Sequence, residues 1–409
     1  MTSETGEIVG KLLAIQFKLV KRANFPFRRF LWQEMGKLGR LSGVKGPRGS
    51  GKTTLLFQLL IDQAGHEKAL YASLDHPLFY TTTLYEVAEY WTMQGGTKLY
   101  LDEVHKYPHQ SPGWASALKS IYDSFPEITI AFTASSALEL ISAEADLSRR
   151  SSMFQLPGLS FREYLQMNQV INIEAVSLNQ LVSEHTNLAA NFANEFKPLV
   201  HFNQYLRTGY LPFAAEFDED IYHQHLLQTL AATLEVDLMA IEPTTTSGII
   251  KMKQLLGIIA ESAPFKPNIS KLAEQLGASR DTIYAYLQNF ERAQVINQLQ
   301  SSTKGVAAFQ KPVKIFLENT NLSYALRNQP DKGNIRETFA INQLKNAGHK
   351  PLSSPKGDLV TEEGFVFEIG GKGKGFRQLE GHPSGYVLAD DIESGIGRRI
   401  PLWMLGLLY

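Results

Sequence analysis

The chain has 409 residues, of which 44% are hydrophobic and 20% charged, as is ordinary for a globular protein of about two to four domains. Its formal net charge of -1 gives no general attraction to nucleic acid or anionic membranes, so any such binding must come from a local patch. It contains no cysteine, which excludes disulfides, thiolate metal sites and cysteine nucleophiles and fits a reducing cytosol. We therefore expect a cytoplasmic protein.

The first segment, residues 1–22, lacks the basic start and unbroken apolar core of a signal peptide. No apolar run in the chain approaches the ~18 residues that span a bilayer, so we expect no membrane partner. Residues 10–35 combine helical spacing of Leu and Phe with a basic aromatic stretch, Phe25–Phe30. They are expected either to dock as a helix on the first domain or to cover the base of a nucleotide bound there.

Residues Leu41–Leu56, LSGVKGPRGSGKTTLL, match the pattern G-x-x-x-x-G-K-[ST] between an apolar strand-like run and a Leu-rich helical run. Glycines in such a loop let backbone N–H groups turn inward around phosphate, and the helix that follows adds the positive end of its dipole. The alternative is a glycine-rich turn that precedes Lys-Thr by chance. The predicted ATP-binding residues are Gly46, Pro47, Arg48, Gly49, Ser50, Gly51, Lys52, Thr53 and Thr54.

The strand predicted at residues 98–101 ends directly in Asp102 and Glu103. A carboxylate at the carboxyl end of a buried strand lies beside the ligand crevice of an open α/β sheet. We therefore predict that Thr53 and Asp102 hold Mg²⁺, that Lys52 reaches the β- and γ-phosphates, and that Glu103 is the general base. The alternative is a strand that ends in an exposed acidic turn.

Two further catalytic groups are predicted downstream. Ser135 follows the strand expected at residues 128–132 and is assigned to sense the γ-phosphate or the attacking water, against simple capping of the helix near Ala137. Arg149 and Arg150 are candidates for an arginine that stabilises transition-state charge, either in cis or from a neighbouring copy in a homo-oligomer. The alternative for both arginines is a solvated or ion-paired surface position.

Strand and helix patterns alternate from Leu41 to Ser160, which predicts an α/β fold with a mostly parallel sheet covered by helices on both faces. We assign residues 1–165 to a P-loop ATPase domain of AAA type and residues 166–245, where helical periodicity dominates, to a helical lid. The polar linker Glu242–Gly248 marks the next boundary. Residues 246–315 are predicted as three helices and a hairpin, which make a winged helix-turn-helix.

The span 250–315 carries nine basic and four acidic residues, a local positive charge that could anchor DNA phosphates. Arg280, Thr282 and Tyr286 are expected near the groove. Winged helices also serve as protein-contact or purely structural modules, and an unidentified protein partner is the alternative.

Residues 316–409 are assigned to a small α/β domain of restriction-endonuclease-like type. Asp358 and Glu368 are expected on paired strands, with Glu337 supplied by the preceding helix, as in a Mg²⁺ site for phosphodiester cleavage. Such sites also use a lysine two residues after the second acid, where this chain has Gly370. Lys372 or Lys374 could replace it, and otherwise the domain is nuclease-shaped but inactive.

The chain resembles an uncharacterised group of prokaryotic AAA-type ATPases that carry a C-terminal domain of unknown function. The resemblance covers nearly the full length and rests on GPRGSGKTTLL, LDEVHKYP, FTASSALEL, LSFREYL, EIGGKGKGFRQ and ADDIESGIGRRIPLWMLGLLY. It implies an ATP-binding core, a winged-helix segment and a degenerate nuclease-like end in a cytoplasmic protein.

Three functions follow as hypotheses. The first is an ATPase that uses ATP and Mg²⁺ and moves the lid relative to the winged helix. The second is a slow nucleotide-gated switch that binds a protein partner. The third is a nucleic-acid-cleaving enzyme that uses Glu337, Asp358 and Glu368.

Overall fold

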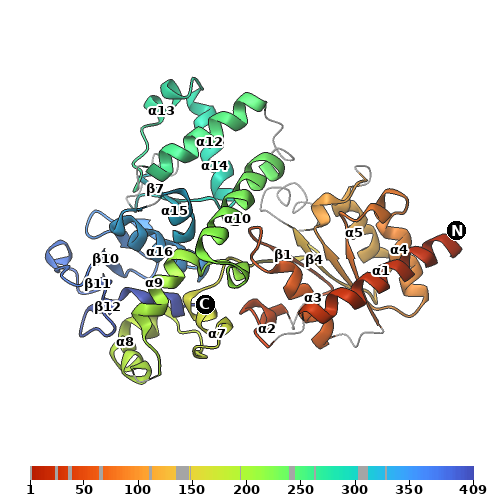
Figure 1. Cartoon of the computed structure of the whole chain (residues 1–409), viewed down its shortest axis with the longest axis horizontal. Coiled ribbons are helices and arrows are strands. Elements are labelled where there is room, and N and C mark those ends of the chain that lie inside the picture. The colour runs from red at the N-terminus through yellow and green to blue at the C-terminus, as the bar shows by residue number, and fades with distance from the viewer. Residues whose placement is uncertain are drawn as a thin grey trace. The chain divides into compact units, whose positions relative to one another are not determined.

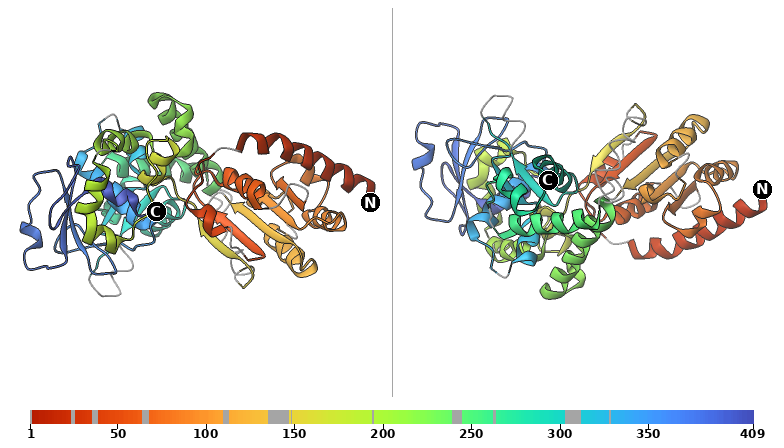
Figure 2. Two further views of the ribbon diagram at one scale, coloured as in Figure 1. Left: turned by 90° about the horizontal axis from the view of Figure 1, so that it is seen from below. Right: turned by 90° about the horizontal axis from the view of Figure 1, so that it is seen from above.

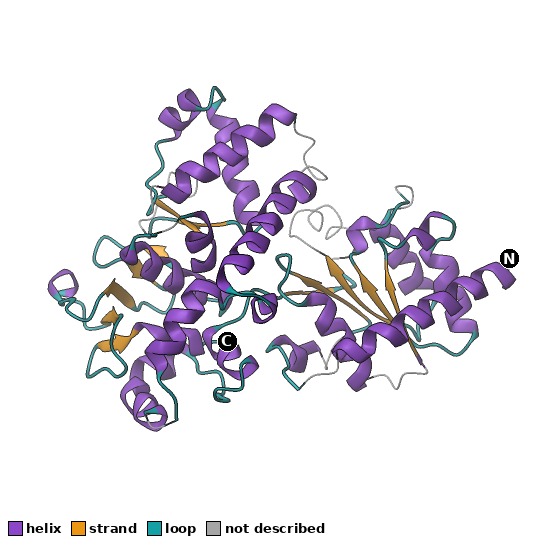
Figure 3. Cartoon of the chain, viewed as in Figure 1, coloured by secondary structure: helices purple, strands orange, loops and turns teal. Residues whose placement is uncertain are grey.

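The computed structural model forms two compact units, Met1–Pro157 and Gly158–Tyr409, drawn in Figures 1 and 3. No helix in the part of the chain that it describes combines the length and apolarity needed to cross a membrane. The described residues are 2–23, 26–35, 39–63, 68–109, 113–134, 147, 149–193, 195–238, 245–261, 264–302, 312–327 and 329–409.

The first unit is built on a five-stranded sheet in the order β2-β3-β4-β1-β5, with every neighbouring pair parallel. The predicted α/β sheet is thereby confirmed. The strand at Ser152–Gln155 was not predicted, because its residues are half-exposed or exposed and lack an apolar run. The strands are β1 (Leu41–Lys45), β2 (Ala69–Ser73), β3 (Lys98–Asp102), β4 (Thr129–Ala134) and β5 (Ser152–Gln155).

Helices cover both faces of this sheet, because alternate residues of each buried strand face opposite sides. Leu70, Leu99 and Ile130 pack in a core with α4 and α5, whereas Tyr71 and Tyr100 pack in a second core with α2 and α3. The helical segments are α1 (Thr2–Ala23), α2 (Leu31–Met35), α3 (Lys52–Gln63), η2 (Pro77–Tyr80), α4 (Leu84–Met93), η3 (Val104–Lys106) and α5 (Trp114–Ser124).

Helix α1 lies beside the edge strand β2, as the views in Figure 2 show. Ile8 and Leu12 join the core on one face of the sheet, while Leu19 packs against the core on the other. Between them, the buried Gln16 donates from Nε2 to the carbonyl of Ala69 (3.1 Å) and accepts from the N–H of Tyr71 (2.7 Å). The helix therefore docks on the first unit, as one of the two alternatives expected, and satisfies backbone groups that an edge strand would leave unpaired.

The second unit is mainly helical in its first half (Figure 3). Its helical segments up to the first hairpin are α7 (Phe161–Met167), α8 (Leu178–Phe192), α9 (Pro198–Thr208), η4 (Pro212–Glu216), α10 (Glu219–Ala232), η5 (Thr233–Asp237), α12 (Thr246–Glu261), α13 (Ile269–Gln275) and α14 (Arg280–Arg292).

Helices α12 to α14 are followed by strands β6 (Ile296–Leu299) and β7 (Lys314–Leu317), which pair antiparallel. The side chain of Ser279 caps α14, as the turn chemistry predicts. The sequence predicts the second strand of this hairpin at residues 306–310, which lie outside the described residues. Tyr286 was expected near a DNA groove, but the residue is buried, with only 8% of it exposed, so it is not available for a groove contact. The winged-helix assignment itself stays a prediction.

The rest of the second unit contains a mixed sheet in the order β12-β11-β10-β9-β8. Strands β9 and β10 pair antiparallel, as expected for the hairpin that carries the terminal acids, while β10, β11 and β12 run parallel. The apolar tail, residues 400–409, is buried as a short strand and a 3₁₀ helix. The elements are α15 (Thr320–Leu326), α16 (Lys332–Asn346), β8 (Leu352–Ser353), β9 (Leu359–Val360), β10 (Val366–Gly370), η7 (Arg377–Leu379), β11 (Gly385–Ala389), β12 (Arg399–Pro401) and η8 (Leu402–Leu407).

A buried carboxyl group, that of Glu318, joins distant parts of this unit. Its oxygens accept hydrogen bonds from Tyr210 (2.7 Å), Asn342 (2.8 Å) and Asn319 (2.7 Å). Burial raises the pKa of Glu318 to about 7, although these donors and the charge of Lys345 oppose the rise. The carboxyl group of Glu318, with a pKa near neutrality, therefore connects the turn at Tyr210 by hydrogen bonds to the segments before and after α15.

Replacing Glu318 by Gln tests this linkage. Because the folded-state pKa lies above the ordinary value, the proton stabilises the native state. Its contribution is complete below about pH 4.5, and about 3 kcal/mol is lost as the pH rises through about 7. Urea unfolding of the full chain should show this fall in the wild type and in the control Glu362→Gln, but not in Glu318→Gln. Parallel pH profiles for all three proteins would contradict the assignment.

Candidate functional site

The loop between β1 and α3 depends on glycine at two points. Gly51 adopts a positive φ of 92°, a conformation that favours residues without Cβ. A Cβ on Gly46 would lie 2.1 Å from the carbonyl oxygen of Leu156, so a larger residue would push the loop away from the end of β5. Both glycines are needed for the tight path that brings Lys52 to the start of α3.

The ammonium of Lys52 is enclosed by its own loop. It donates to the carbonyl oxygens of Gly46 and Pro47, each at 2.9 Å, and the side chain is only 6% exposed. The hydroxyl of Ser50, in the same loop, is buried with no hydrogen-bond partner in the described part of the chain. A loop that contains both a buried unpartnered hydroxyl and a lysine ammonium is suited to receive an anion.

The structure brings Thr53 and Asp102 together from separate elements. Asp102 ends β3 and is 3% exposed, and its Oδ2 accepts a hydrogen bond from Thr53 Oγ1 at 2.7 Å. The same carboxylate accepts from the hydroxyl of Tyr71 at 3.0 Å and from that of Thr133. A hydroxyl and a carboxylate in contact at the start of the loop helix are the oxygen ligands that Mg²⁺ prefers. The metal role of the pair stays a prediction.

Glu103 follows in a left-handed conformation with a φ of 51°. Its N–H donates to Thr133 Oγ1 (3.1 Å), and its carboxylate pairs with Lys106 at 3.0 Å and His105 at 3.5 Å. Burial raises the pKa of Glu103, but the charges of His105, Lys106 and Lys52 outweigh it, so the pKa lies below its ordinary value. The carboxylate is thus ionised at neutral pH, the state that a general base requires.

Three supporting residues were not singled out from the sequence. Tyr71 and Thr133 hold Asp102, and the buried Arg29 donates to the carbonyls of Ser50 (2.5 Å) and Pro157 (2.9 Å), which fixes the loop against the end of β5. The basic aromatic stretch that contains Arg29 was noted, but its target was not predictable. Thr133 lies two residues before Ser135, the hydroxyl residue that was selected after the strand expected at residues 128–132.

The other predicted catalytic residues are not gathered at the loop by any described contact. Ser135 lies outside the described residues. Arg150 forms a bidentate ion pair with Asp123 of α5, through Nε at 3.0 Å and Nη2 at 3.1 Å. This is the ion-paired surface position that was the alternative to a catalytic role. Arg149 is exposed. The arginine role therefore stays a prediction.

The three acids predicted in the second unit share one cluster with two lysines. Lys314 of β7 pairs with Glu337 of α16 at 2.8 Å and lies 3.8 Å from Asp358. Asp358 also accepts from the N–H of Ile369 at 2.8 Å, next to Glu368. Burial raises the pKa values of Glu337 and Glu368, and the neighbouring carboxylates add to the rise while the lysines oppose it. Each acid thus has a protein partner.

Lys374 occupies the space that a side chain at position 370 would take. A Cβ on Gly370 would lie 2.7 Å from the Cβ, Cγ and Cδ atoms of Lys374, whose ammonium pairs with the buried Glu368. Of the two lysines considered as substitutes, Lys374 is therefore one that contacts the second acid, and its role in cleavage stays a prediction. No group of three or more His, Asp or Glu side chains in the described ranges is arranged to hold a metal ion.

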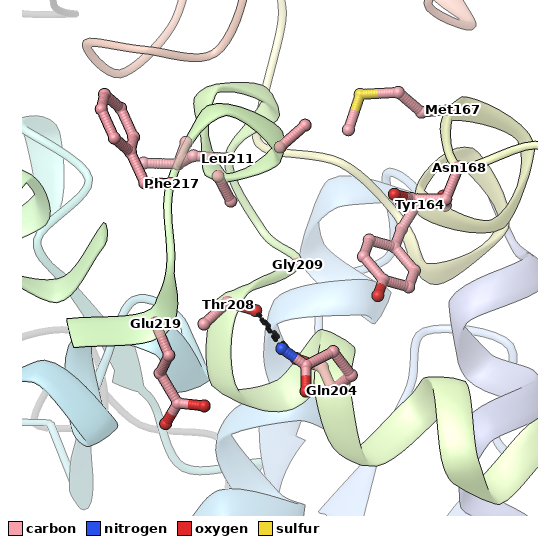
Figure 4. Close-up of a pocket in the computed structure, with 11 residues that line it drawn as sticks. Tyr164, Met167, Asn168, Gln204, Thr208, Gly209, Leu211, Phe217 and Glu219 are labelled. Atoms are coloured by element: carbon pink, nitrogen blue, oxygen red, sulfur yellow. Dashed lines mark hydrogen bonds between the residues drawn. The ribbon is translucent and has the colours of Figure 1, made fainter. Parts of the chain in front are cut away.

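A small pocket of about 150 Å³ lies between α7, α9 and the start of α10 (Figure 4). Tyr164, Gln204, Phe217 and Glu219 are among its lining residues, and Gln204 donates to Thr208, one turn further along α9, at 2.9 Å. All of the residues that line it lie outside the predicted sites.

A parallel sheet whose strand β1 runs into a glycine-rich loop and helix is consistent with the P-loop NTPase fold. Residues 39–165 match the family described as an AAA domain, and residues 199–333 match a domain of unknown function (DUF8612). The chain thus contains an AAA domain followed by a domain of unknown function.

Among solved structures, the chain is similar to AMPPCP-bound DnaA from Aquifex aeolicus, with 14% identity over 69% of this chain and 89% of that one and a TM-score of 0.26. NtrX from Brucella abortus in complex with ADP has 16% identity over 65% and 68%, with a TM-score of 0.29. A signal-transduction ATPase with numerous domains from Pyrococcus horikoshii has 12% identity over 78% and 45%, with a TM-score of 0.27. No curated protein matches the chain.

Proposed function

We propose that this chain binds ATP with Mg²⁺ and hydrolyses it. The observation that carries the proposal is the 2.7 Å contact between Thr53 Oγ1 and Asp102 Oδ2, because it joins the loop helix to the acidic end of β3. The match of residues 39–165 to an AAA domain supports the same chemistry.

The loop residues, Gly46 to Thr54, would bind the triphosphate. Backbone N–H groups of the loop and the N-terminus of α3 attract the anion, and Lys52 exchanges its two carbonyl partners for phosphate oxygens. A phosphate oxygen is the stronger acceptor, because its hydrogen bond to an ammonium joins opposite charges.

Thr53 and Asp102 would hold Mg²⁺, which neutralises charge on the phosphates when bound. Glu103 takes the proton of the attacking water, and its depressed pKa keeps it in the basic form near neutral pH. Its ion pair with Lys106 holds the carboxylate in place in this structure. Arg149 or Arg150 would meet the γ-phosphate in cis or from a second copy, and use of Arg150 requires release of Asp123.

The second unit would transmit the nucleotide state to a partner, which we propose to be DNA contacted by α13 and α14. Several basic residues of the region have protein partners: Lys251 donates to Gly277, Lys253 pairs with Glu235, and Lys314 pairs with Glu337. Lys266, Lys271 and Arg280 are exposed, and they offer the positive charge that phosphates require.

Phosphodiester cleavage is a second candidate function, favoured by the placement of Lys374 over Gly370. Mg²⁺ is usually held by one or two carboxylates together with substrate phosphates, so Asp358 and Glu368 would be sufficient protein ligands. The ion pair of Glu337 with Lys314 would persist as support for the site.

Glu103→Gln tests hydrolysis. Loss of the general base should lower steady-state phosphate release by about 10²–10⁴-fold and leave ATP affinity unchanged. The control is Glu127→Gln, an exposed glutamate ahead of β4, which should retain wild-type activity. If the wild type binds ATP but its slow turnover does not respond to Glu103→Gln, the chain is a nucleotide-gated switch rather than an enzyme.

The double variant Lys271→Ala/Arg280→Ala tests DNA binding. We expect weaker affinity for duplex DNA and a dependence of log affinity on log salt that is shallower by about 2 than in the wild type. Lys253→Ala, whose side chain is already paired with Glu235, should leave the slope unchanged. Fluorescence anisotropy over a salt series measures both quantities. A flat salt dependence in the wild type would exclude phosphate contacts.

Asp358→Asn tests cleavage. The second candidate function predicts nicking of plasmid DNA that requires Mg²⁺ and is abolished by this change. Asp391→Asn is the control, because Asp391 is exposed and pairs with Arg336 outside the cluster. Intact plasmid at every Mg²⁺ concentration with the wild type would make the cluster purely structural.

A further inference from the structure

The carboxylate of Asp102 offers about four acceptor positions, and three hydroxyl groups occupy three of them. Oδ2 accepts from Thr53 at 2.7 Å and from Tyr71 at 3.0 Å, and Oδ1 accepts from Thr133. Thr53 is also part of the phosphate-loop motif, and Thr133 also accepts a hydrogen bond from the N–H of Glu103, so each of them has a second role at the site. Tyr71 is the remaining donor: its hydroxyl donates to Asp102 and also interacts with the side chain of Ser73.

Tyr71 is placed by the sheet rather than by the loop. It lies in β2, where it is the parallel register partner of Tyr100, while Ser73 is the partner of Asp102. Its ring packs against that of Phe57 of α3, with centroids 4.3 Å apart, and the residue is 4% exposed. The hydroxyl is thus carried to the carboxylate by a rigid ring in a close-packed core.

The backbone of Tyr71 is fixed from the outer side of the sheet. Its N–H donates to Gln16 Oε1 at 2.7 Å, and Gln16 Nε2 donates to the carbonyl of Ala69 at 3.1 Å. A buried glutamine of α1 therefore replaces the missing neighbour of the edge strand. A line of direct contacts runs from α1 through Gln16 and Tyr71 to Asp102.

We propose that Tyr71 is a positioning residue that orients Asp102 for the magnesium ion of the nucleotide, a role that rests on the proposed function. If the Thr53 oxygen coordinates the metal, the Tyr71 hydroxyl still donates to Oδ2 of Asp102 and holds the carboxylate in its orientation. One acceptor position of Asp102 Oδ1 then stays available. Without that donor the carboxylate can rotate. Loss of the hydroxyl should therefore weaken metal binding but leave the affinity of the loop for phosphate unchanged.

Tyr71→Phe tests the proposal, because it removes the hydroxyl and keeps the ring. The matched control is Tyr100→Phe, since Tyr100 is as buried as Tyr71 and sits beside it in register but donates to the carbonyl of Leu59 instead. Calorimetry with a non-hydrolysable ATP analogue, with and without Mg²⁺, measures the gain in affinity due to the metal. We expect this gain to fall about tenfold in Tyr71→Phe, because the loss of one hydrogen bond to a charged group has an effect of this size. The affinity measured without Mg²⁺ should stay unchanged.

An unchanged metal-dependent gain in Tyr71→Phe, or an equal loss in Tyr100→Phe, overturns the proposal while leaving the ATPase assignment intact. If the wild type binds no analogue under either condition, the proposed function fails first and this inference fails with it. Thermal unfolding reports whether each variant folds. If Tyr71→Phe does not fold, Gln16→Met is the alternative variant, because it removes the side-chain hydrogen bonds to β2 but keeps the Tyr71 hydroxyl. We expect the same loss of the metal-dependent gain in affinity. An unchanged gain would again overturn the proposal.

Discussion

The contact between the Asp102 carboxylate and the Thr53 hydroxyl is the constraint on which the first unit depends. A carboxylate that is 3% exposed is tolerated only if its oxygens are paired, and here three hydroxyl groups from α3, β2 and β4 pair with it. Because these donors come from different elements, the carboxylate fixes the loop helix against the carboxyl ends of three strands. The same arrangement leaves acceptor capacity for a cation.

The second unit relies on a different kind of interior. Around α15 and α16, the side chains of Asn321 and Asn342 bind backbone carbonyls of α9 and of residue 318, and Tyr222 donates to Asn321 at 2.7 Å. Such networks are specific when every member is satisfied, because an unpaired buried polar group is costly. They hold the turn that follows α9 in one geometry.

The features that the sequence predicted are local ones. The spacing of Gly46, Gly51 and Lys52 is set within one loop, and Asp102 is recognised because it ends an apolar run. Tyr71 and Arg29 could not be found in this way, since each acts on a group far along the chain and nothing beside it in sequence marks its target. Tyr286 was misplaced because the register of α14 decides which of its tyrosines is buried. Lys374 was only one of two options until the fold showed its stem beside Gly370.

The central claim is that one magnesium triphosphate is bound where the loop, Lys52 and the end of β3 meet. The most direct measurement is a calorimetric titration of the intact chain with ATP in the presence and absence of Mg²⁺, repeated with Asp102→Asn. We predict a single site per chain, tighter with Mg²⁺ than without it, and loss of that difference in Asp102→Asn. Absence of any heat of binding to folded wild-type protein, or an undiminished effect of Mg²⁺ in Asp102→Asn, would contradict it.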